Sequence, residues 1–587
     1  MLTVKEAQEI IKKELHICAK VETKLSLGYT LREDVYSPVN IPYYPTSTRD
    51  GYAWNSNWTT NRIRLNTEKL TPAGQITSTT NNAEETVYIA TGGQLESTVY
   101  DCVLMVEYAN IVEEDGVQYI SRKEDTPEML PYTYVRKVGS DVSKGELLLK
   151  KGTVIQSSMV GLLLLAHIPS VKVEWKKIEF HLFSSGNELV DIYDCEDDSK
   201  VVDCNRYMLS DRCKELQLES FYPLEINNYR ILEDNLEDVR ETIDFFKYKT
   251  GFHIIITTGG ASVGKFDYNK QVAGELGTVY FKNVNMMPGK PITFCKISDS
   301  VFWFVLAGNP TSSMVQFDTF IRPICTDFRY VLSSPELYVT CGEDFISNDP
   351  KRIEYQRVRY DETSKTLIKL EKQQSSSLLS FVQSTGYICL NASKKKGDLA
   401  EYIPKVYRPL LDGKVRIGVI TCSDRAYNGI YEDISGVELQ NFLKEKCKEE
   451  IEIMYVCIPD DKDEIRNAIR YLSRWCIAIF TTGGTGPTYR DNTVLIMKEC
   501  ISKELPGFGE RMRQVSLQYI PTAILSGQTA GIIYCDPSEM GCFICNCPGS
   551  PKSIRECLSE VWSAIPKCIE LACGRRLDCI DAFFPKK

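Results

Sequence analysis

The stretch Thr257-Thr-Gly-Gly-Ala-Ser-Val-Gly264 directly follows the apolar run His253-Ile-Ile-Ile256, and a close copy of it returns as Thr481-Thr-Gly-Gly-Thr-Gly486. β-Branched runs favour strands, and ligands of open parallel sheets bind outside the carboxyl ends of the strands. Glycines let the backbone approach an anion closely, and their amides attract phosphate-like groups. The repeated stretch therefore predicts two related pockets for anionic ligands.

Two further cues accompany each copy in the same order along the chain. They are Ser184-Ser-Gly-Asn-Glu-Leu189 and Ala307-Gly-Asn-Pro-Thr-Ser312 in the first block, and Thr421-Cys-Ser-Asp-Arg425 and Pro548-Gly-Ser-Pro-Lys-Ser553 in the second. Each cue follows a predicted strand. Strands that alternate with helices, such as Asn205–Leu216, predict a parallel, doubly wound sheet. A single Gly-rich turn is weak evidence of a site, but three cues in one order predict a duplicated α/β domain.

The fold class predicted for the whole chain is α/β plus β. Residues 4–20 repeat apolar positions at helical spacing and predict an amphipathic helix, while short alternating segments predict a β-rich insertion. The predicted boundaries are 1–45 with 140–175 for an N-terminal linker subdomain, 46–139 for the β-rich insertion, 176–332 for the first α/β block, 333–408 for a small β subdomain and 414–575 for the second α/β block.

Composition limits the chemistry of this 587-residue chain. Hydrophobic residues make up 43% and charged residues 25%, which is ordinary globular usage. A net charge of −10 and a pI of about 5.3 imply no general affinity for nucleic acid. Only four histidines occur and the last is His253, so the C-terminal half must use other groups for catalysis. No apolar run is long enough to span a bilayer and the first residues do not resemble a signal peptide, so we expect a cytoplasmic protein.

The 22 cysteines are scattered along the chain. Cys542-Phe-Ile-Cys545, followed by Cys547, has the spacing of half a zinc site, but no second such pair or histidine pair lies nearby. The same residues also form an apolar strand pattern that runs into a Pro-Gly turn. We therefore expect reduced thiols in the core, where free cysteine behaves as a small hydrophobic residue.

The motifs resemble those of the eukaryotic molybdenum-cofactor insertion proteins, which fuse a MoeA-like E domain to a MogA-like G domain. Plant fusions have this E-then-G order, and the related gephyrin has the reverse. The resemblance covers about residues 1–408 for E and 414–575 for G. It rests on Ser47-Thr-Arg-Asp-Gly-Tyr-Ala53, Ser185-Gly-Asn-Glu-Leu189, Asp203-Cys-Asn-Arg-Tyr-Met-Leu209, the run from Thr258 to Tyr268, Pro288-Gly-Lys-Pro291, Ser423-Asp424, the run from Thr481 to Asp491, Pro506-Gly-Phe-Gly-Glu-Arg-Met-Arg513 and Pro548-Gly-Ser-Pro-Lys-Ser553.

For the G part the resemblance implies adenylylation of molybdopterin, in which the terminal phosphate of the pterin attacks Mg-ATP and releases pyrophosphate. Such chemistry depends on positioned phosphates, Mg²⁺ and carboxylates. The family's acidic positions fall on Asp460 and Asp491, with Asp491 as a Mg²⁺ ligand. Asp491 could instead cap a helix, and Asp460 with Asp461 could be a solvated loop pair. The implied ATP and molybdopterin contacts are Ser423, Asp424, Thr482, Gly483, Gly484, Thr485, Gly486, Gly549, Ser550 and Lys552.

For the E part the resemblance implies a Mg²⁺-dependent insertion of molybdate into adenylated molybdopterin, which releases AMP and the finished cofactor. Carboxylates suit this task as metal ligands and as water-positioning bases. The implied catalytic residues are Asp50, Glu188, Asp234 and Asp267, of which Glu188 and Asp267 would bind Mg²⁺. The implied pterin contacts are Thr91, Arg136, Asp141, Gly259, Gly260, Ser262, Asn309 and Pro310, and the implied molybdate contacts are Lys290, Ser312, Arg352 and Ser376.

The resemblance also implies a homo-oligomer. In the family the β-rich insertion of one subunit faces the sheet of another across an E-type dimer cleft, and G-type domains form trimers. The remaining partners that we expect are small-molecule substrates, with neither nucleic acid nor a membrane involved.

Four residues depart from the family pattern. Met287 stands where the family usually has lysine, and Asn283 stands where it has a basic residue, although Lys282 is adjacent. Ala307 replaces the usual proline and Gly527 the usual arginine. Loss of the lysine removes a charge-assisted donor, so we expect weaker molybdate binding.

Two alternative functions stay open at this point. A gephyrin-like scaffold is one, although the long central linker typical of that use is missing. A nucleotide-cleaving relative of the G fold is the other, because one fold can host different phosphate chemistries.

Overall fold

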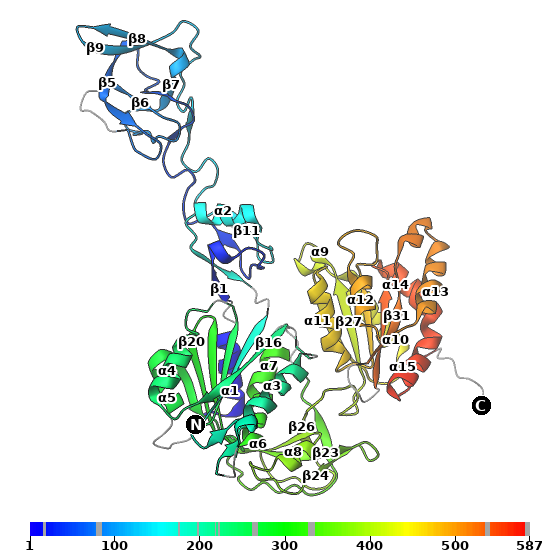
Figure 1. The fold of residues 1–587 in the computed structure, drawn as a ribbon. Helices are drawn as coiled ribbons and strands as arrows, with labels where there is room; N and C mark the ends of the chain where they lie inside the picture. Colours follow the sequence, from blue (N-terminus) through cyan, green and yellow to red (C-terminus); the bar gives the residue numbers. More distant parts are fainter. Residues whose placement is uncertain are drawn as a thin grey trace. The chain divides into compact units, whose positions relative to one another are not determined.

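The computed structural model describes residues 1–15, 19–60, 62–77, 85–173, 177–195, 199–217, 219–220, 223–249, 251–260, 268–326, 335–534 and 540–580. The chain divides into two compact units, one of Cys18–Trp175 and one of Met1–Ile17 with Lys176–Lys587. Figure 1 traces the elements of both units. Within the described residues no helix is both long and apolar enough to cross a membrane.

The unit of Cys18–Trp175 is built mainly from strands. Its largest sheet has the order β7-β4-β6-β5-β9-β8, with apolar clusters that include Trp54 and Val103. The strands of this sheet are β4 (Gly51–Trp54), β5 (Arg62–Thr71), β6 (Glu85–Ile89), β7 (Cys102–Met105), β8 (Ala109–Glu114) and β9 (Val117–Arg122). The smaller elements are the pairs β1 (Ala19–Glu22) with β12 (Ser170–Val173), β2 (Val35–Tyr36) with β11 (Leu147–Leu149), and β3 (Thr46–Ser47) with β10 (Val135–Arg136), and the helix α2 (Ser157–Leu165).

The first helix is shorter than its periodicity predicts. α1 spans Val4–Leu15, whereas the sequence predicts a helix over residues 4–20. Residues Ala19–Glu22 form β1 instead, in antiparallel register with β12. The prediction is wrong at this end because the chain passes from one compact unit to the other after Ile17, and strand pairing there overrides the helical pattern.

The first α/β block contains a six-stranded sheet with the order β16-β13-β17-β21-β20-β18. The first four strands in this order are parallel to one another through three pairings, and the last two pairings are antiparallel. Every residue of β17 is buried, as expected for a parallel strand covered by helices on both faces. The strands are β13 (Ile178–Ser185), β16 (Leu224–Leu232), β17 (His253–Thr258), β18 (Thr278–Asn283), β20 (Pro291–Ser298) and β21 (Val301–Leu306). The helices are α3 (Asn205–Leu216), α4 (Leu236–Asp244), α5 (Tyr268–Leu276), α6 (Pro310–Gln316) and α7 (Arg322–Thr326), with α4 and α5 together on one face of the sheet (Figure 1).

The second α/β block repeats this topology. Its sheet has the order β28-β27-β29-β32-β31-β30, in which the first four strands are again parallel and the last two pairings are antiparallel. The predicted pair of doubly wound α/β domains is therefore confirmed. The strands are β27 (Arg416–Cys422), β28 (Glu452–Ile458), β29 (Ala478–Thr482), β30 (Lys503–Glu504), β31 (Ala530–Tyr534) and β32 (Gly541–Cys547). The helices are α9 (Asp424–Tyr427), α10 (Ile434–Lys446), α11 (Lys462–Ser473), α12 (Thr493–Cys500), α13 (Pro506–Leu517), α14 (Pro551–Val561) and α15 (Ile565–Cys573).

The cysteine-rich segment lies in the core of this second block. Cys542, Cys545 and Cys547 belong to β32 and are at most 1% exposed. The prediction of core thiols is confirmed.

A small β domain completes the chain. Its strands have the order β19-β23-β24-β22-β26-β25, and an additional pairing of β23 with β25 closes the sheet. β19 comes from the middle of the first α/β block, between β18 and β20, yet it pairs with β23. The elements are β19 (Met286–Met287), β22 (Tyr338–Cys341), β23 (Ile353–Asp361), β24 (Thr366–Lys369), β25 (Gly386–Leu390) and β26 (Leu399–Pro404), with the helix α8 (Leu378–Gln383).

Candidate functional site

The two Gly-rich turns occupy matching positions in the two sheets. Thr258 ends β17 beside Ser184 and Leu306, and Thr482 ends β29 beside Thr421 and Cys547. The cues that the sequence places after three strands therefore meet at one edge of each sheet. This edge is the carboxyl edge, where ligands of such sheets bind.

Glycine is required immediately after each of these threonines. Gly259 and Gly483 both have a φ of +91°. A Cβ on Gly259 would lie 2.3 Å from the carbonyl oxygen of Ser185, and one on Gly483 would lie 2.2 Å from that of Cys422. The two turns are thus shaped by the same close approach of one strand end to the next.

A reciprocal pair of hydrogen bonds joins two strand ends in the second block. The Asp424 amide donates to Asp460 Oδ2 and the Asp460 amide donates to Asp424 Oδ1, each over 3.1 Å. Arg490 forms an ion pair with Asp424, and the Asn492 side chain donates to the carbonyl of Asp460 over 3.1 Å. This clasp fixes both carboxylates at the mouth of the Gly-rich turn.

Asp460 has an electrostatic environment that suits a ligand contact. Its Oδ1 is buried and has no hydrogen-bond partner among the residues that the structure describes. Burial raises the pKa of Asp460, with a smaller contribution from the nearby charge of Asp424. Its neighbour Asp461 caps α11 by accepting from the amides of Asp463 and Glu464. The two aspartates are therefore not an equivalent solvated pair.

Asp491 faces the same turn. Its Oδ2 accepts from the Thr488 amide over 2.9 Å and from the Thr488 hydroxyl over 2.6 Å. A Cβ on Gly486 would lie 2.7 Å from that oxygen, so the carboxylate packs directly against the Gly-rich loop. The residue that precedes α12 as its N-cap is Asn492, so Asp491 does not fill the capping role that the sequence leaves open.

Other residues predicted for the G part form hydrogen bonds close to the Gly-rich turn. The Thr482 hydroxyl donates to the Pro548 carbonyl over 2.8 Å, and the Gly549 carbonyl accepts from Ser435 Oγ over 2.7 Å. Ser423 caps α9, and its hydroxyl lies 2.8 Å from that of Tyr431.

Three further positions complete the second-block mouth. The Thr485 carbonyl accepts from the Gly527 amide over 2.8 Å. Ser550 is the N-cap of α14 and is followed by a proline at the first helical position. The Lys552 side chain is exposed, with Glu556 3.8 Å away, so its charge is accessible to a ligand.

The first block has a clasp of the same form. The Asn187 amide donates to Asp234 Oδ2 and the Asp234 amide donates to Asn187 Oδ1, each over 3.1 Å. Asp234 and Asp460 thus hold equivalent places, while an amide stands at 187 where the second block has the carboxylate of Asp424. Glu188 is exposed, and its carboxylate bends back over Gly186.

Two predicted residues of this block, Ser262 and Asp267, lie outside the described residues. Gly260 has a φ of +61°, and a Cβ there would lie 2.6 Å from Asn269 Nδ2. Gly484, its counterpart, has a φ of +58°.

Gln316 links the turn of Lys290 to the end of β21. Its Oε1 accepts from the Ala307 amide over 2.8 Å and its Nε2 donates to the Gly289 carbonyl over 2.7 Å. Asn309, which precedes Pro310 at the start of α6, donates to Ser375 Oγ over 3.1 Å. These bonds join the segments that contain three of the four residues predicted to contact molybdate, Lys290, Ser312 and Ser376, but not Arg352.

The four predicted molybdate residues differ in accessibility. Lys290 and Ser376 are exposed, and Arg352 is partly exposed with its Nε 2.8 Å from Asp349 Oδ2. Ser312, within α6, is only 3% exposed. Lys290, Arg352 and Ser376 therefore offer surface groups, whereas Ser312 is buried.

The predicted residues of the unit Cys18–Trp175 form two pairs. Asp50 Oδ1 accepts from the amide and the hydroxyl of Thr91, over 2.7 and 3.0 Å, and these bonds lower the pKa of Asp50. Arg136 forms an ion pair with Asp141. All four side chains are accessible at the surface of their unit.

Known protein families match the same blocks. The family described as "Probable molybdopterin binding domain" matches residues 181–327 and again 418–567, and the "MoeA N-terminal region (domain I and II)" matches residues 2–166. The chain belongs to this molybdopterin-binding family. It joins a MoeA-type E part to a MogA-like G part and is related to gephyrin.

Three relatives illustrate this membership. A molybdopterin adenylyltransferase of Helicobacter pylori is 45% identical over 179 residues, which is 30% of this chain and 98% of the relative. A molybdopterin molybdenumtransferase of Haemophilus influenzae is 26% identical over 404 residues, which is 67% of this chain and 95% of the relative. Gephyrin of Dictyostelium discoideum is 30% identical over 436 residues, covering 65% of this chain and 59% of that protein.

Four residues that contact the predicted site residues or lie beside them are absent from the sequence prediction. Arg490 and Asn187 each lie inside a quoted motif, next to a predicted residue. Thr493 could not be found by motif, yet its buried hydroxyl oxygen lies 2.2 Å from where a Cβ on Gly484 would stand and contacts the Cys422 thiol. Asn546, in β32, donates to Thr481 Oγ1 over 2.8 Å and holds that threonine in place.

Proposed function

We propose that this chain is a bifunctional enzyme of molybdenum cofactor biosynthesis. The G part would be a molybdopterin adenylyltransferase, and the E part a molybdopterin molybdotransferase that uses the adenylated product. The observation that supports this most directly is the anion-binding edge built twice on one chain, each copy with a clasped aspartate. The two kinds of single-function relative, one for each part, support the same division of activities.

In the G part the amides of the Gly483–Gly484 turn and the Thr485 hydroxyl would receive the phosphates, while the buried Thr482, bound to the Pro548 carbonyl, would hold the turn in place. Lys552 would neutralise phosphate charge, and Asp460 and Asp491 would orient the reacting groups. The protein contributes position and electrostatics in this type of reaction, because phosphoryl chemistry needs little covalent participation from side chains.

Magnesium fits the G residues. Asp491 would hold the ion, and the unpartnered buried Asp460 Oδ1 is an oxygen of the kind that hard cations prefer. When bound, Mg²⁺ neutralises the charge of the polyphosphate. In the E part Glu188 offers an exposed carboxylate, and Asp267, outside the described residues, would be the second ligand.

In the E part Asp234 and Glu188 would position water for hydrolysis of adenylated molybdopterin, with the Gly259–Gly260 turn, Asn309 and Pro310 at the pterin. Molybdate would be a substrate held by Lys290, Arg352 and Ser376, with the buried Ser312 as the fourth predicted contact. Asp50, Thr91, Arg136 and Asp141 would complete this site from another subunit.

We further propose a homo-oligomer with E-type dimer and G-type trimer contacts. We also propose the E-then-G order of the eukaryotic plant-type fusions, the predicted domain boundaries and a cytoplasmic location.

The decisive experiment incubates the full chain with molybdopterin and Mg-ATP and measures pyrophosphate, then adds molybdate and measures AMP. We expect molybdopterin-dependent pyrophosphate release followed by molybdate-dependent AMP release. Pyrophosphate without molybdopterin would favour the nucleotide-cleaving alternative. Absence of both products would contradict the enzymatic function and favour a scaffold.

Met287→Lys is expected to tighten molybdate binding several-fold. Met287 is partly exposed, next to the turn of Lys290, and a lysine there would add a charge-assisted donor for a dianion. Titration calorimetry with molybdate measures the change, and Met287→Gln is the control for side-chain length without charge. Equal affinities of Met287→Lys and the unaltered chain would contradict the expectation.

A further inference from the structure

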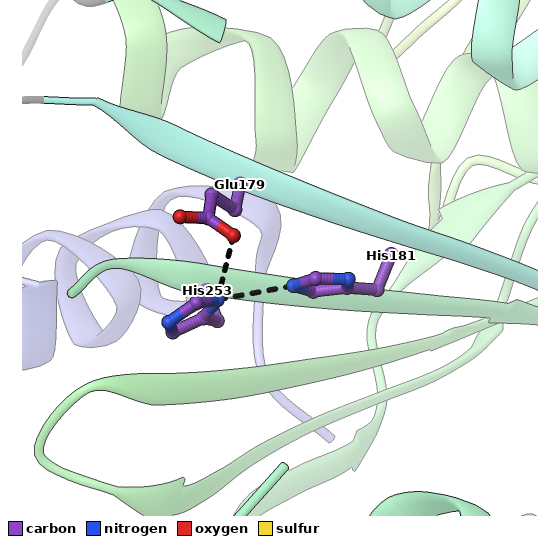
Figure 2. Close-up of side chains that lie close together, drawn as sticks. All are labelled: Glu179, His181 and His253. Carbon is purple, nitrogen blue, oxygen red and sulfur yellow. Dashed lines mark hydrogen bonds and ion pairs between the residues drawn. The ribbon is translucent and has the colours of Figure 1, made fainter. Parts of the chain in front are cut away.

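Two of the four histidines, His181 and His253, face each other on β13 and β17, toward the amino ends of these strands and away from the Gly-rich turn. His181 Nε2 lies 3.0 Å from His253 Nδ1, and Glu179 Oε2 lies 3.6 Å from the same His253 nitrogen (Figure 2). One ligand atom from each of the three residues lies within 4.8 Å of the other two. Both histidines are 3% exposed, and the Glu179 side chain is 19% exposed.

Strand geometry places the three side chains on one face. Glu179 and His181 are two residues apart on β13, and Glu179 is the register partner of His253 on the parallel strand β17. Ser185, whose carbonyl lies beside the Gly-rich turn, is six residues beyond Glu179 and four beyond His181 along β13, about 20 and 13 Å at a strand's rise per residue. The cluster is therefore separate from the anion-binding edge.

The distances fit a small divalent ion. Tetrahedral Zn²⁺ with bonds of about 2.0–2.2 Å to nitrogen and oxygen holds its ligand atoms about 3.3–3.5 Å apart. Two of the three separations, 3.0 and 3.6 Å, differ from that by only a few tenths of an ångström, and the third, between the ligand atoms of His181 and Glu179, lies within 4.8 Å. Two imidazoles with one carboxylate form an N/N/O ligand set that zinc accepts, and the Glu179 side chain, which is 19% exposed, is the side from which a water would reach the fourth position.

The surroundings of the cluster also suit a metal. The Tyr229 hydroxyl lies 3.2 Å from His181 Nδ1, so with Nε2 on a metal the Nδ1 proton would be donated to Tyr229 and would fix the ring. Lys177 binds Glu179 Oε1 over 2.8 Å, which leaves Oε2 for the ion.

The second α/β block shows that this fold does not need the cluster. Counting back from Ser184 and Thr258, and equally from their counterparts Thr421 and Thr482, places Arg416, Gly418 and Ile477 at the three equivalent positions. None of these three residues offers a comparable ligand. A requirement of the fold that both blocks share therefore does not explain why the first block has two buried histidines and a carboxylate at these positions.

We propose that Glu179, His181 and His253 bind one divalent transition-metal ion, Zn²⁺ by preference, which ties together the amino ends of β13 and β17. The ion replaces the proton that the two imidazoles otherwise share. Its role is structural, because the reaction edge lies at the other end of the same strands.

The test uses the full chain, stripped of metal with a chelator and titrated with Zn²⁺ against a chromophoric indicator. We expect one equivalent to bind, Glu179→Gln and His253→Gln to weaken that equivalent by more than tenfold, and Tyr229→Phe to weaken it about tenfold. Zn²⁺ should raise the thermal unfolding midpoint of the unaltered chain and not that of Glu179→Gln. His167→Gln, which changes an exposed histidine outside the cluster, is the matched control and should bind as the unaltered chain does.

Cobalt distinguishes this site from the cysteines. Co²⁺ bound by the cluster should give visible ligand-field bands without the near-ultraviolet charge-transfer band of thiolate ligands. Thiolate bands, or unchanged Zn²⁺ binding by Glu179→Gln and His253→Gln, would overturn the proposal in favour of adventitious binding elsewhere. Absence of any bound equivalent would also overturn it and leave a hydrogen-bonded histidine pair. Circular dichroism of each variant verifies its fold, and Glu179→Gln keeps the test valid if His253→Gln does not fold.

Discussion

Asp491→Asn is expected to lower the rate of molybdopterin adenylylation by about a hundredfold or more, while the fold is retained. Asparagine keeps the size of the side chain and one oxygen for the Thr488 bonds, but it removes the negative charge that faces the Gly-rich loop. Loss of one preorganised electrostatic contact in an active site typically costs about 10²–10³ in rate. Single-turnover formation of adenylated molybdopterin from Mg-ATP measures the effect directly.

The control for this substitution is Asp461→Asn. Asp461 is adjacent to the proposed site and caps α11, and asparagine is an equally good N-cap, so the rate should stay within about twofold. Molybdate-dependent AMP release from supplied adenylated molybdopterin should be unchanged in Asp491→Asn, because that step belongs to the E part. Full adenylylation by Asp491→Asn would contradict the site assignment.

Gly483→Ala and Gly259→Ala are expected to separate the two activities. The new Cβ would lie 2.2 or 2.3 Å from a backbone oxygen, and both glycines have a positive φ, so the turn must move. A residue forced into such a conformation costs about 1–3 kcal/mol, and a misplacement of about 1 Å in an active site can cost about a hundredfold in rate. Gly483→Ala should therefore abolish most adenylylation and spare molybdate insertion, and Gly259→Ala should do the reverse.

Matched controls come from glycines with space around them. Gly507 in α13 and Gly274 in α5 have no atom within 4 Å of an added Cβ and have ordinary φ values, so Gly507→Ala and Gly274→Ala should keep both activities. Chemical denaturation of each variant distinguishes a local change from global unfolding. Loss of both activities in either Gly483→Ala or Gly259→Ala, with the fold intact, would contradict independent sites.

The repeated block could be predicted from the sequence because its signals are local. The apolar runs that end in Thr257-Thr-Gly-Gly260 and Thr481-Thr-Gly-Gly484 determine both the strand and the turn that follows, and the order of three such cues determines the sheet edge. The clasp between Asp424 and Asp460 could not be predicted, because it depends on two backbone amides that meet only after the sheet forms.

Other features depend on contacts between distant segments. The end of α1 is decided by the pairing of β1 with β12, about 150 residues further along the chain. The cluster of the two buried histidines could not be predicted, because His181 and His253 are far apart in sequence. Each of them, taken alone, is simply one residue of an apolar strand. Ser262 and Asp267 stay predictions from the resemblance.

The pairing of β19 with β23 also limits how such chains can be rearranged. Met286 and Met287 come from the middle of one domain and complete the sheet of the next. A recombination breakpoint anywhere between them and β23 would leave one parent's strand to pair with the other parent's sheet. Exchange of the small β domain alone therefore risks a mismatched pairing of β19 with β23. In a chimeric chain the first α/β block and the small β domain should therefore come from the same parent.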